Sequence, residues 1–162
     1  MICSDNNEKL IDLLPQKRIL IVADDADSSK RAVMFVADLL GGQAGYSISL
    51  VNFTRIPVDL FPGDEAVEWA KNKHVDVEIM LESYKGILMS AGFLESAISS
   101  QIIIEPFSST AQRILDFQRE NNFCILVIGN RDLKREEEIL FGSTTKRIIN
   151  ICKKNCAVWV ID

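Results

Sequence analysis

Short, uninterrupted apolar runs, separated by stretches with helical spacing, are the feature that most limits what this chain can fold into. Residues 18–23, 123–128 and 157–161 are almost entirely apolar and show no alternation with polar residues. Such runs are typical of strands that are buried on both faces, as in a parallel sheet. Between the first two runs, residues 32–40 place apolar side chains on one face of a helix.

The order of these segments predicts a layered α/β fold. We expect strands at residues 18–23, 46–53, 93–104, 123–128 and 157–161. We expect helices at residues 64–90 and 143–153, a helix to residue 40 that is capped by Ser28 or Ser29, and a helix to residue 121 that is capped by Ser109. Strands that alternate with helices form right-handed βαβ units. The sequence therefore predicts an open, Rossmann-like parallel sheet of five strands with helices on both faces. This domain spans residues 18–162, and residues 1–17 form an arm or short helix before it.

Composition places the chain among globular proteins and argues against two classes of binder. Of 162 residues, 48% are hydrophobic and 25% are charged, which is the usual globular range. A net charge of −5 and a pI near 5.0 argue against a general binder of nucleic acid or of membrane surfaces. The first residues carry no signal-peptide pattern, and no apolar run approaches the length of a membrane span. We therefore expect a cytoplasmic protein.

The C-terminal segment has the layout of a phosphate-binding loop. A strand runs into Gly129, a charged loop follows, and Gly142 and Ser143 precede a helix. Glycine lets a backbone approach a ligand closely, and the free N–H groups at a helix N-terminus attract anions. The loop is longer than most strand-to-helix connections, which favours a functional role over a plain surface excursion.

In its order and spacing this segment resembles the universal stress proteins. Nucleotide-binding members of that family carry the pattern G-x2-G-x9-G-[ST], and this chain has Gly129, Asp132, Gly142 and Ser143 at those positions. The resemblance covers residues 18–161. Together with the alternation of strands and helices, it implies the strand order 3-2-1-4-5.

The resemblance also implies a site for an adenine nucleotide, either ATP or AMP. Phe53 stands where a small aliphatic side chain usually meets adenine, so we expect it to fill part of the pocket. The implied set is Val22 and Ile128 as pocket walls, Asp24 and Phe53 at the adenosine, Gly129, Gly142, Ser143 and Thr144 at the phosphates and ribose, and Arg131 and Asp132 in the loop.

Asp132 is the position where the chain departs from the family pattern. A side chain replaces the hydrogen that lets phosphate approach the backbone, and its charge opposes the phosphate oxygens. Two unit charges ~4–5 Å apart repel by about 1 kcal/mol in water, and by more in a partly desolvated site. Arg131, Lys134 and Lys146 could offset part of that repulsion. We therefore expect ATP binding to be weakened or lost.

No catalytic arrangement is recognisable in the sequence. There is no Walker P-loop, and the single histidine, His74, sits in a polar helical stretch. Asp24, Asp25 and Asp27 could hold Mg²⁺, but solvated acids near a helix N-terminus explain them better. We expect a protein that is not an enzyme, requires no cofactor and has no metal site of its own. Mg²⁺ would enter only with a nucleotide.

The fifth strand is the predicted interface between two copies of the chain. An exposed apolar sheet edge invites pairing with another chain, and members of the resembling family often dimerise through this strand. The alternative is that apolar side chains of residues 1–17 fold back over the edge. The expected interface residues are Ala157, Val158, Trp159, Val160 and Ile161.

Two functions fit these observations. The leading hypothesis is a non-enzymatic protein of the universal stress type, a cytoplasmic homodimer that acts in a stress response through contacts with an unidentified protein partner. The rival hypothesis is an adenine-nucleotide sensor or slow ATPase, in which Arg131 and Lys134 replace the missing backbone contact. Neither function involves nucleic acid or a membrane.

Overall fold

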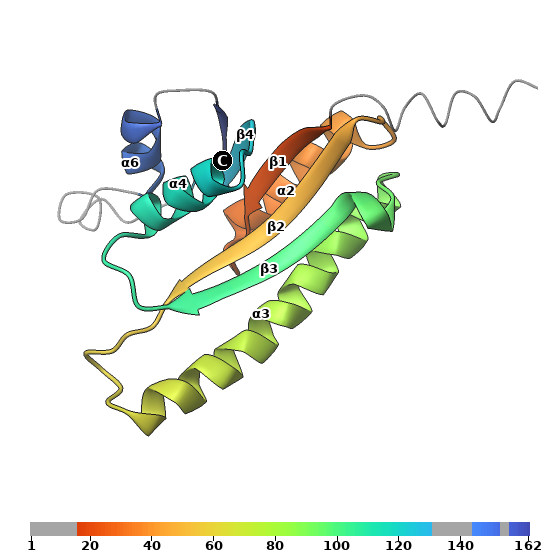
Figure 1. Ribbon diagram of the computed structural model, residues 1–162. Coiled ribbons are helices and arrows are strands. Elements are labelled where there is room, and N and C mark those ends of the chain that lie inside the picture. The colour runs from red at the N-terminus through yellow and green to blue at the C-terminus, as the bar shows by residue number, and fades with distance from the viewer. Residues whose placement is uncertain (1–15, 131–143, 153–155) are drawn as a thin grey trace, which may run out of the picture.

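Five parallel strands form a central sheet. The computed structural model describes residues 16–130, 144–152 and 156–162. The strands pair in the order β3-β2-β1-β4-β5, and every pairing is parallel (Figure 1). The predicted fold class and the strand order 3-2-1-4-5 are therefore confirmed. The strands are β1 (Lys17–Val22), β2 (Tyr46–Arg55), β3 (Ile98–Glu105), β4 (Ile125–Gly129) and β5 (Ala157–Ile161).

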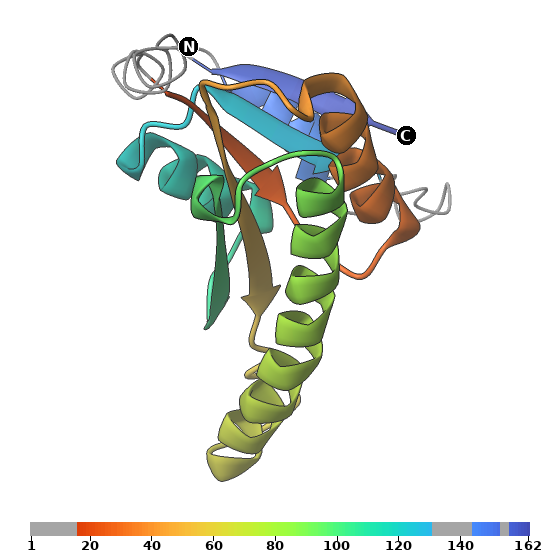
Figure 2. The same ribbon diagram turned by 90° about the vertical axis from the view of Figure 1, so that its right-hand side faces the viewer.

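Helices cover both faces of this sheet (Figure 2). One face carries α2 (Asp27–Leu40) and α3 (Asp64–Ser90), and the other carries α4 (Thr110–Glu120) and α6 (Thr144–Ile151). A short 3-10 turn, η1 (Glu95–Ala97), leads into β3. Within the described ranges, no helix combines the length and the apolar character that crossing a membrane requires.

The sheet separates two apolar layers. Ile19 and Ile21 of β1 pack with the α2 and α3 side, whereas Leu20 packs with the α4 and α6 side. All three side chains are fully buried. Successive residues of a strand point to opposite faces, so a strand with helices on both sides has no position for a polar residue. This explains the uninterrupted apolar run of the first strand.

The two predicted serine caps have different outcomes. Ser109 caps α4 as predicted, because its hydroxyl accepts a hydrogen bond from the backbone N–H of Gln112 at 3.3 Å. The predicted start of α2 at Ser28 or Ser29 is wrong. The helix begins at Asp27, and both serines lie buried inside its first turn.

Two strands begin later than predicted. The third predicted strand started at residue 93, but β3 begins at Ile98 after the turn η1. The fourth started at residue 123, but β4 begins at Ile125. There Asn122 has a φ of 54°, and the N–H of Phe123 bonds to the carbonyl of Gln118, so these residues still close the end of α4. Residues 1–15 of the predicted arm lie outside the described residues.

Candidate functional site

A cleft lies at the carboxyl ends of β1, β2 and β4. Its volume is about 480 Å³, and residues of α3, α4 and α6 complete its walls. Ligands of open parallel sheets bind outside the carboxyl ends of the strands, where the strand order reverses. Here that point lies between β1 and β4. Of the residues predicted for the nucleotide site, the cleft is lined by Val22, Asp24, Phe53, Ile128, Gly129 and Thr144.

The remaining predicted site residues belong to the loop after β4. Arg131, Asp132, Gly142 and Ser143 lie outside the described residues, as does Lys134. Their proposed contacts with phosphate therefore stay predictions.

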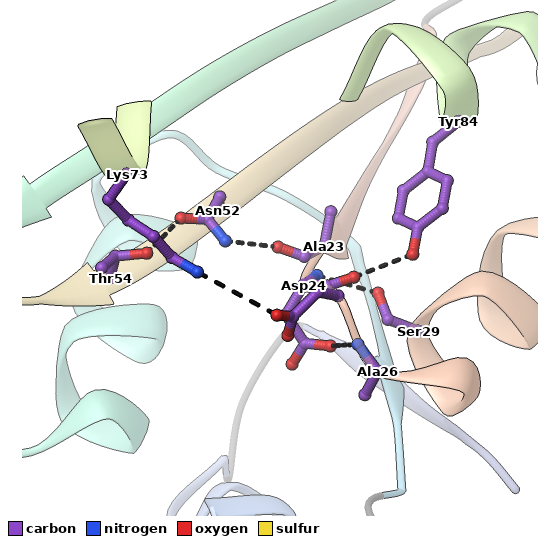
Figure 3. A network of polar contacts seen from close by, with 9 residues as sticks. Ala23, Asp24, Ala26, Ser29, Asn52, Thr54, Lys73 and Tyr84 are labelled. Carbon is purple, nitrogen blue, oxygen red and sulfur yellow. Dashed lines mark hydrogen bonds and ion pairs between the residues drawn. The ribbon is translucent and has the colours of Figure 1, made fainter. Parts of the chain in front are cut away.

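Asp24 is held in a fixed position by the turn between β1 and α2 (Figure 3). Its carboxylate Oδ1 accepts a hydrogen bond from the backbone N–H of Ala26 at 2.9 Å. Its own N–H donates to Ser29 Oγ at 2.9 Å, and its carbonyl accepts from the Tyr84 hydroxyl at 2.8 Å. The turn, α2 and α3 together orient this carboxylate at the edge of the cleft.

Tyr84 is the link between α3 and that turn. Its side chain is only 5% exposed, although its hydroxyl reaches the Asp24 carbonyl. Burial raises the pKa of Tyr84, and the nearby negative charges of Asp24, Asp25 and Asp27 raise it further, against a lowering effect of a hydrogen bond with Ser29. The hydroxyl is therefore neutral at ordinary pH and acts as a donor.

A buried polar chain at the end of β2 was not predicted. The amide of Asn52 is 4% exposed and donates to the Ala23 carbonyl at 2.8 Å. Thr54 in turn donates its hydroxyl proton to Asn52 Oδ1 at 2.5 Å. Asn52 and Thr54 both line the cleft. Asn52 directly follows the apolar pair Leu50 and Val51, and an amide at such a position was the signal in the sequence that could have revealed this feature.

Phe53 forms part of the cleft wall. Its ring is half-buried and packs edge to face against Phe117 of α4, with 5.5 Å between the ring centres. This packing holds the ring against the apolar layer on the α4 and α6 side. The cleft keeps its volume of about 480 Å³ with Phe53 in this position.

Gly129 has a packing role that the sequence did not show. A Cβ atom at this position would lie 2.5 Å from the carbonyl carbon and oxygen of Ser28 and 2.6 Å from the nitrogen of Ser29. Only glycine lets the first turn of α2 come this close to the end of β4. The residue lines the cleft as predicted, but its lack of a side chain is already explained by this contact between elements.

The charged residues of the cleft are mostly acidic. Asp24, Asp25 and Asp76 line it together with Lys73, so the described lining carries a formal charge of −2. Lys73 Nζ lies 4.0 Å from Asp25 Oδ2. Neither Lys73 nor Asp76 was predicted as a site residue. The carboxylates do not amount to a metal centre, since among the described residues no group of three or more potential ligands could hold a metal ion.

The predicted interface strand β5 is at the edge of the sheet, beside β4. Ala157 is exposed and Val160 is 37% exposed. The other three residues, Val158, Trp159 and Ile161, are half-buried. The Trp159 ring packs edge to face on Phe35 of α2, with 6.3 Å between the ring centres. The apolar surface of β5 is thus partly covered by α2 of the same chain.

Comparisons with known proteins agree on one family. The sequence profile of the universal stress protein family matches residues 16–161. A search of proteins with curated functions found no significant match.

Solved structures of that family share the fold. The universal stress protein from Lactobacillus plantarum is 13% identical, with 91% of this chain and 99% of that chain covered and a TM-score of 0.69. A universal stress protein in complex with cAMP is 15% identical, with 91% and 98% covered and a TM-score of 0.63. The protein from Archaeoglobus fulgidus in complex with dAMP is 18% identical, with 93% and 100% covered and a TM-score of 0.55. With its profile match, strand order and cleft, this chain belongs to the universal stress protein family.

Proposed function

We propose that this protein is a non-enzymatic universal stress protein that works in the cytoplasm and acts on a protein partner as a homodimer. Its cleft binds an adenine nucleotide with one phosphate in preference to ATP. The observation that carries this proposal is the cleft at the carboxyl ends of β1, β2 and β4, which has apolar walls and an acidic rim.

The charge of the cleft favours ligands with few phosphates. Three carboxylates and one ammonium group line it, and Asp132 would add a further negative charge in the loop. Two like unit charges ~4–5 Å apart repel by about 1 kcal/mol in water and by more where water is excluded, and the repulsion falls as the distance grows. A triphosphate would be opposed by Asp132 of the loop and, over longer distances, by the carboxylates that line the cleft. A triphosphate carries more negative charge into this field than a monophosphate does. ATP should therefore lose more affinity than AMP.

Polar groups of α6, on the side of the cleft away from α3, support binding of a single phosphate. Thr144 and Thr145 open α6, and both line the cleft, as Gly129 does. Hydroxyl groups and the free N–H groups of a first helical turn are suitable donors to phosphate oxygens. Relatives have been solved in complex with cAMP and dAMP, each of which carries a single phosphate.

The rival is an ATP sensor or slow ATPase, in which Arg131 and Lys134 compensate for Asp132. Small molecules released from the purified, denatured protein distinguish the two by mass spectrometry. AMP or no nucleotide is the expected result. Co-purifying ATP, together with phosphate release from added ATP, would favour the rival.

Calorimetry then tests the role of charge. We expect the wild-type protein to bind AMP at least about tenfold more tightly than ATP, a difference of about 1.4 kcal/mol. Asp132→Gly should tighten ATP binding by a similar factor and change AMP binding little. Asp38→Asn is the matched control, because Asp38 is exposed on α2 and does not line the cleft. Micromolar ATP binding by the wild type with no gain in Asp132→Gly would overturn the proposal.

A further inference from the structure

We propose that Lys73 and Asp76 of α3 recognise the hydrogen-bonding edge of the ligand's base and make the cleft selective for adenine. This inference rests on the proposed nucleotide site. The nucleotide-binding residues implied by the family pattern lie at the strand ends and in the loop after β4. The inference adds residues of α3 to the part of the site that recognises the base.

The placement of α3 brings these two side chains to the cleft. Lys73, Asp76, Val77 and Met80 all line it and follow the spacing of one helical face. The charged residues Lys73 and Asp76 lie nearer the start of α3 than the apolar residues Val77 and Met80 do. Figure 3 shows Lys73 extending from α3 toward the turn after β1.

The end of β2 supplies a fixed acceptor that lines the same cleft as Lys73. Thr54 donates its hydroxyl proton to Asn52, and Asn52 donates its amide to the Ala23 carbonyl. Because the Thr54 proton is committed to Asn52, its oxygen can only accept from a group in the cleft. The cleft lining contributed by β2 and α3 therefore offers one donor, Lys73, and two acceptors, Thr54 and Asp76.

Electrostatics decides between a phosphate and a base at this position. Asp24, Asp25 and Asp76 line the same cleft as Lys73, the single ammonium group among the described lining residues, so the charged lining is negative on balance. A phosphate placed here would meet three carboxylates for one cation. A neutral group that both donates and accepts hydrogen bonds is not repelled by these charges. It can accept a hydrogen bond from Lys73 and donate one to Asp76 or Thr54.

The adenine edge has this combination. Its exocyclic amino group donates, and the adjacent ring nitrogen accepts. We assign Lys73 Nζ as the donor to a ring nitrogen, and Asp76 with Thr54 as acceptors for the amino group. The ion pair of Lys73 with Asp25 does not prevent this, because the two groups are 4.0 Å apart and the Asp25 side chain is 76% exposed. Exposed pairs of that kind are weak and exchange partners easily.

The test for Lys73 pairs a protein change with a ligand change. The probes are AMP and two analogues in which N1 or N7 is replaced by a CH group, and the readout is affinity by calorimetry. We expect Lys73→Met to bind AMP about tenfold more weakly. One of the two analogues should lose about tenfold with the wild type but nothing further with Lys73→Met. Lys71→Met on the same helix, outside the cleft, is the matched control and should bind AMP like the wild type.

The test for Asp76 is the converse. Asp76→Asn should weaken AMP binding, yet leave unchanged the binding of purine ribonucleoside monophosphate, which lacks the amino group. Losses that are equal for AMP and for every analogue would overturn the inference, while the nucleotide site itself would stand. If the wild type binds no AMP at all, both this inference and the proposed function fail. Thermal unfolding of each variant confirms that it is folded.

Discussion

Ser29 is a buried polar residue whose hydroxyl organises the turn after β1. It is 2% exposed, accepts from the Asp24 N–H at 2.9 Å and donates to the Val22 carbonyl at 3.4 Å. The sequence predicted it as a possible helix cap, since serine is common at that position. In the structure its hydroxyl instead satisfies backbone groups that the chain leaves unpaired where the strand ends and the helix begins. Asp24 owes its orientation to this local bonding.

Tyr84 gives a prediction at the same scale. Replacing it by phenylalanine removes the hydrogen bond to the Asp24 carbonyl, and we expect a loss of about 1 kcal/mol in the free energy of unfolding. The folded-state pKa of Tyr84 is raised above its usual value, so the folded state holds this proton more tightly than the unfolded state. The contribution is complete below the unfolded pKa of about 10 and falls as pH rises through the folded pKa.

Urea unfolding of the wild type and Tyr84→Phe across pH measures this effect. The difference between the two proteins should be constant from neutral pH to about 9 and should shrink above about 10. A difference that stays the same at pH 11 would contradict the buried, hydrogen-bonded hydroxyl.

At the scale of elements, α3 shows what the sequence could and could not predict. Its bounds, residues 64–90, were predicted correctly from the sequence. The position of α3 relative to the sheet was not predicted. The first part of α3 extends past the ends of β2 and β3 (Figure 2). That position depends on side chains such as Tyr84, which bonds to a residue 60 positions away.

The same limit applies to the cleft. Predicted site residues at the ends of strands were found there, because the carboxyl ends of parallel strands meet at one edge of the sheet. Lys73 and Asp76 were missed because nothing local distinguishes them from the solvated charges of an exposed helix. The role of Gly129 was only partly predicted, since its contact with α2 joins two segments about 100 residues apart.

Two glycines test how tightly the elements pack. Gly129→Ala should lower the free energy of unfolding by about 1–3 kcal/mol, because the new Cβ would overlap the backbone of Ser28 and α2 must shift. Gly86→Ala is the matched change within α3. There the added Cβ meets nothing within 4 Å, so we expect a gain of about 0.5–1 kcal/mol from helix propensity. Urea denaturation measures both, and a neutral Gly129→Ala would show that α2 does not pack on β4 this closely.

At the scale of the whole molecule, the two edges of the sheet are unequal. The β3 edge presents polar residues, with Ser99, Ser100 and Gln101 all exposed. The β5 edge presents Ala157 and Val160, and the neighbouring Phe35 of α2 is 43% exposed. Polar side chains protect an edge from pairing with another chain, whereas an apolar edge invites it. We therefore expect two copies of the chain to pair at β5 rather than at β3.

We predict a homodimer through β5, with a two-fold axis that brings the two edge strands together, the commonest symmetry for such a contact. Val160→Lys should convert the dimer to a monomer, because a charge would be placed on the apolar edge. Val160 is a better target than Val158, which packs against the apolar layer on the α4 and α6 side. A lysine at Val158 would weaken the fold as well as the interface.

Sedimentation velocity of the wild type, Val160→Lys and a control decides the matter. Ile79→Lys is the control, because Ile79 is an exposed apolar residue of α3, 67% accessible, on an element other than the edge strand. It should leave the dimer intact. A wild-type monomer would contradict the prediction and favour the alternative in which residues 1–17 cover the edge. A dimer that withstands Val160→Lys would show that the interface lies away from β5.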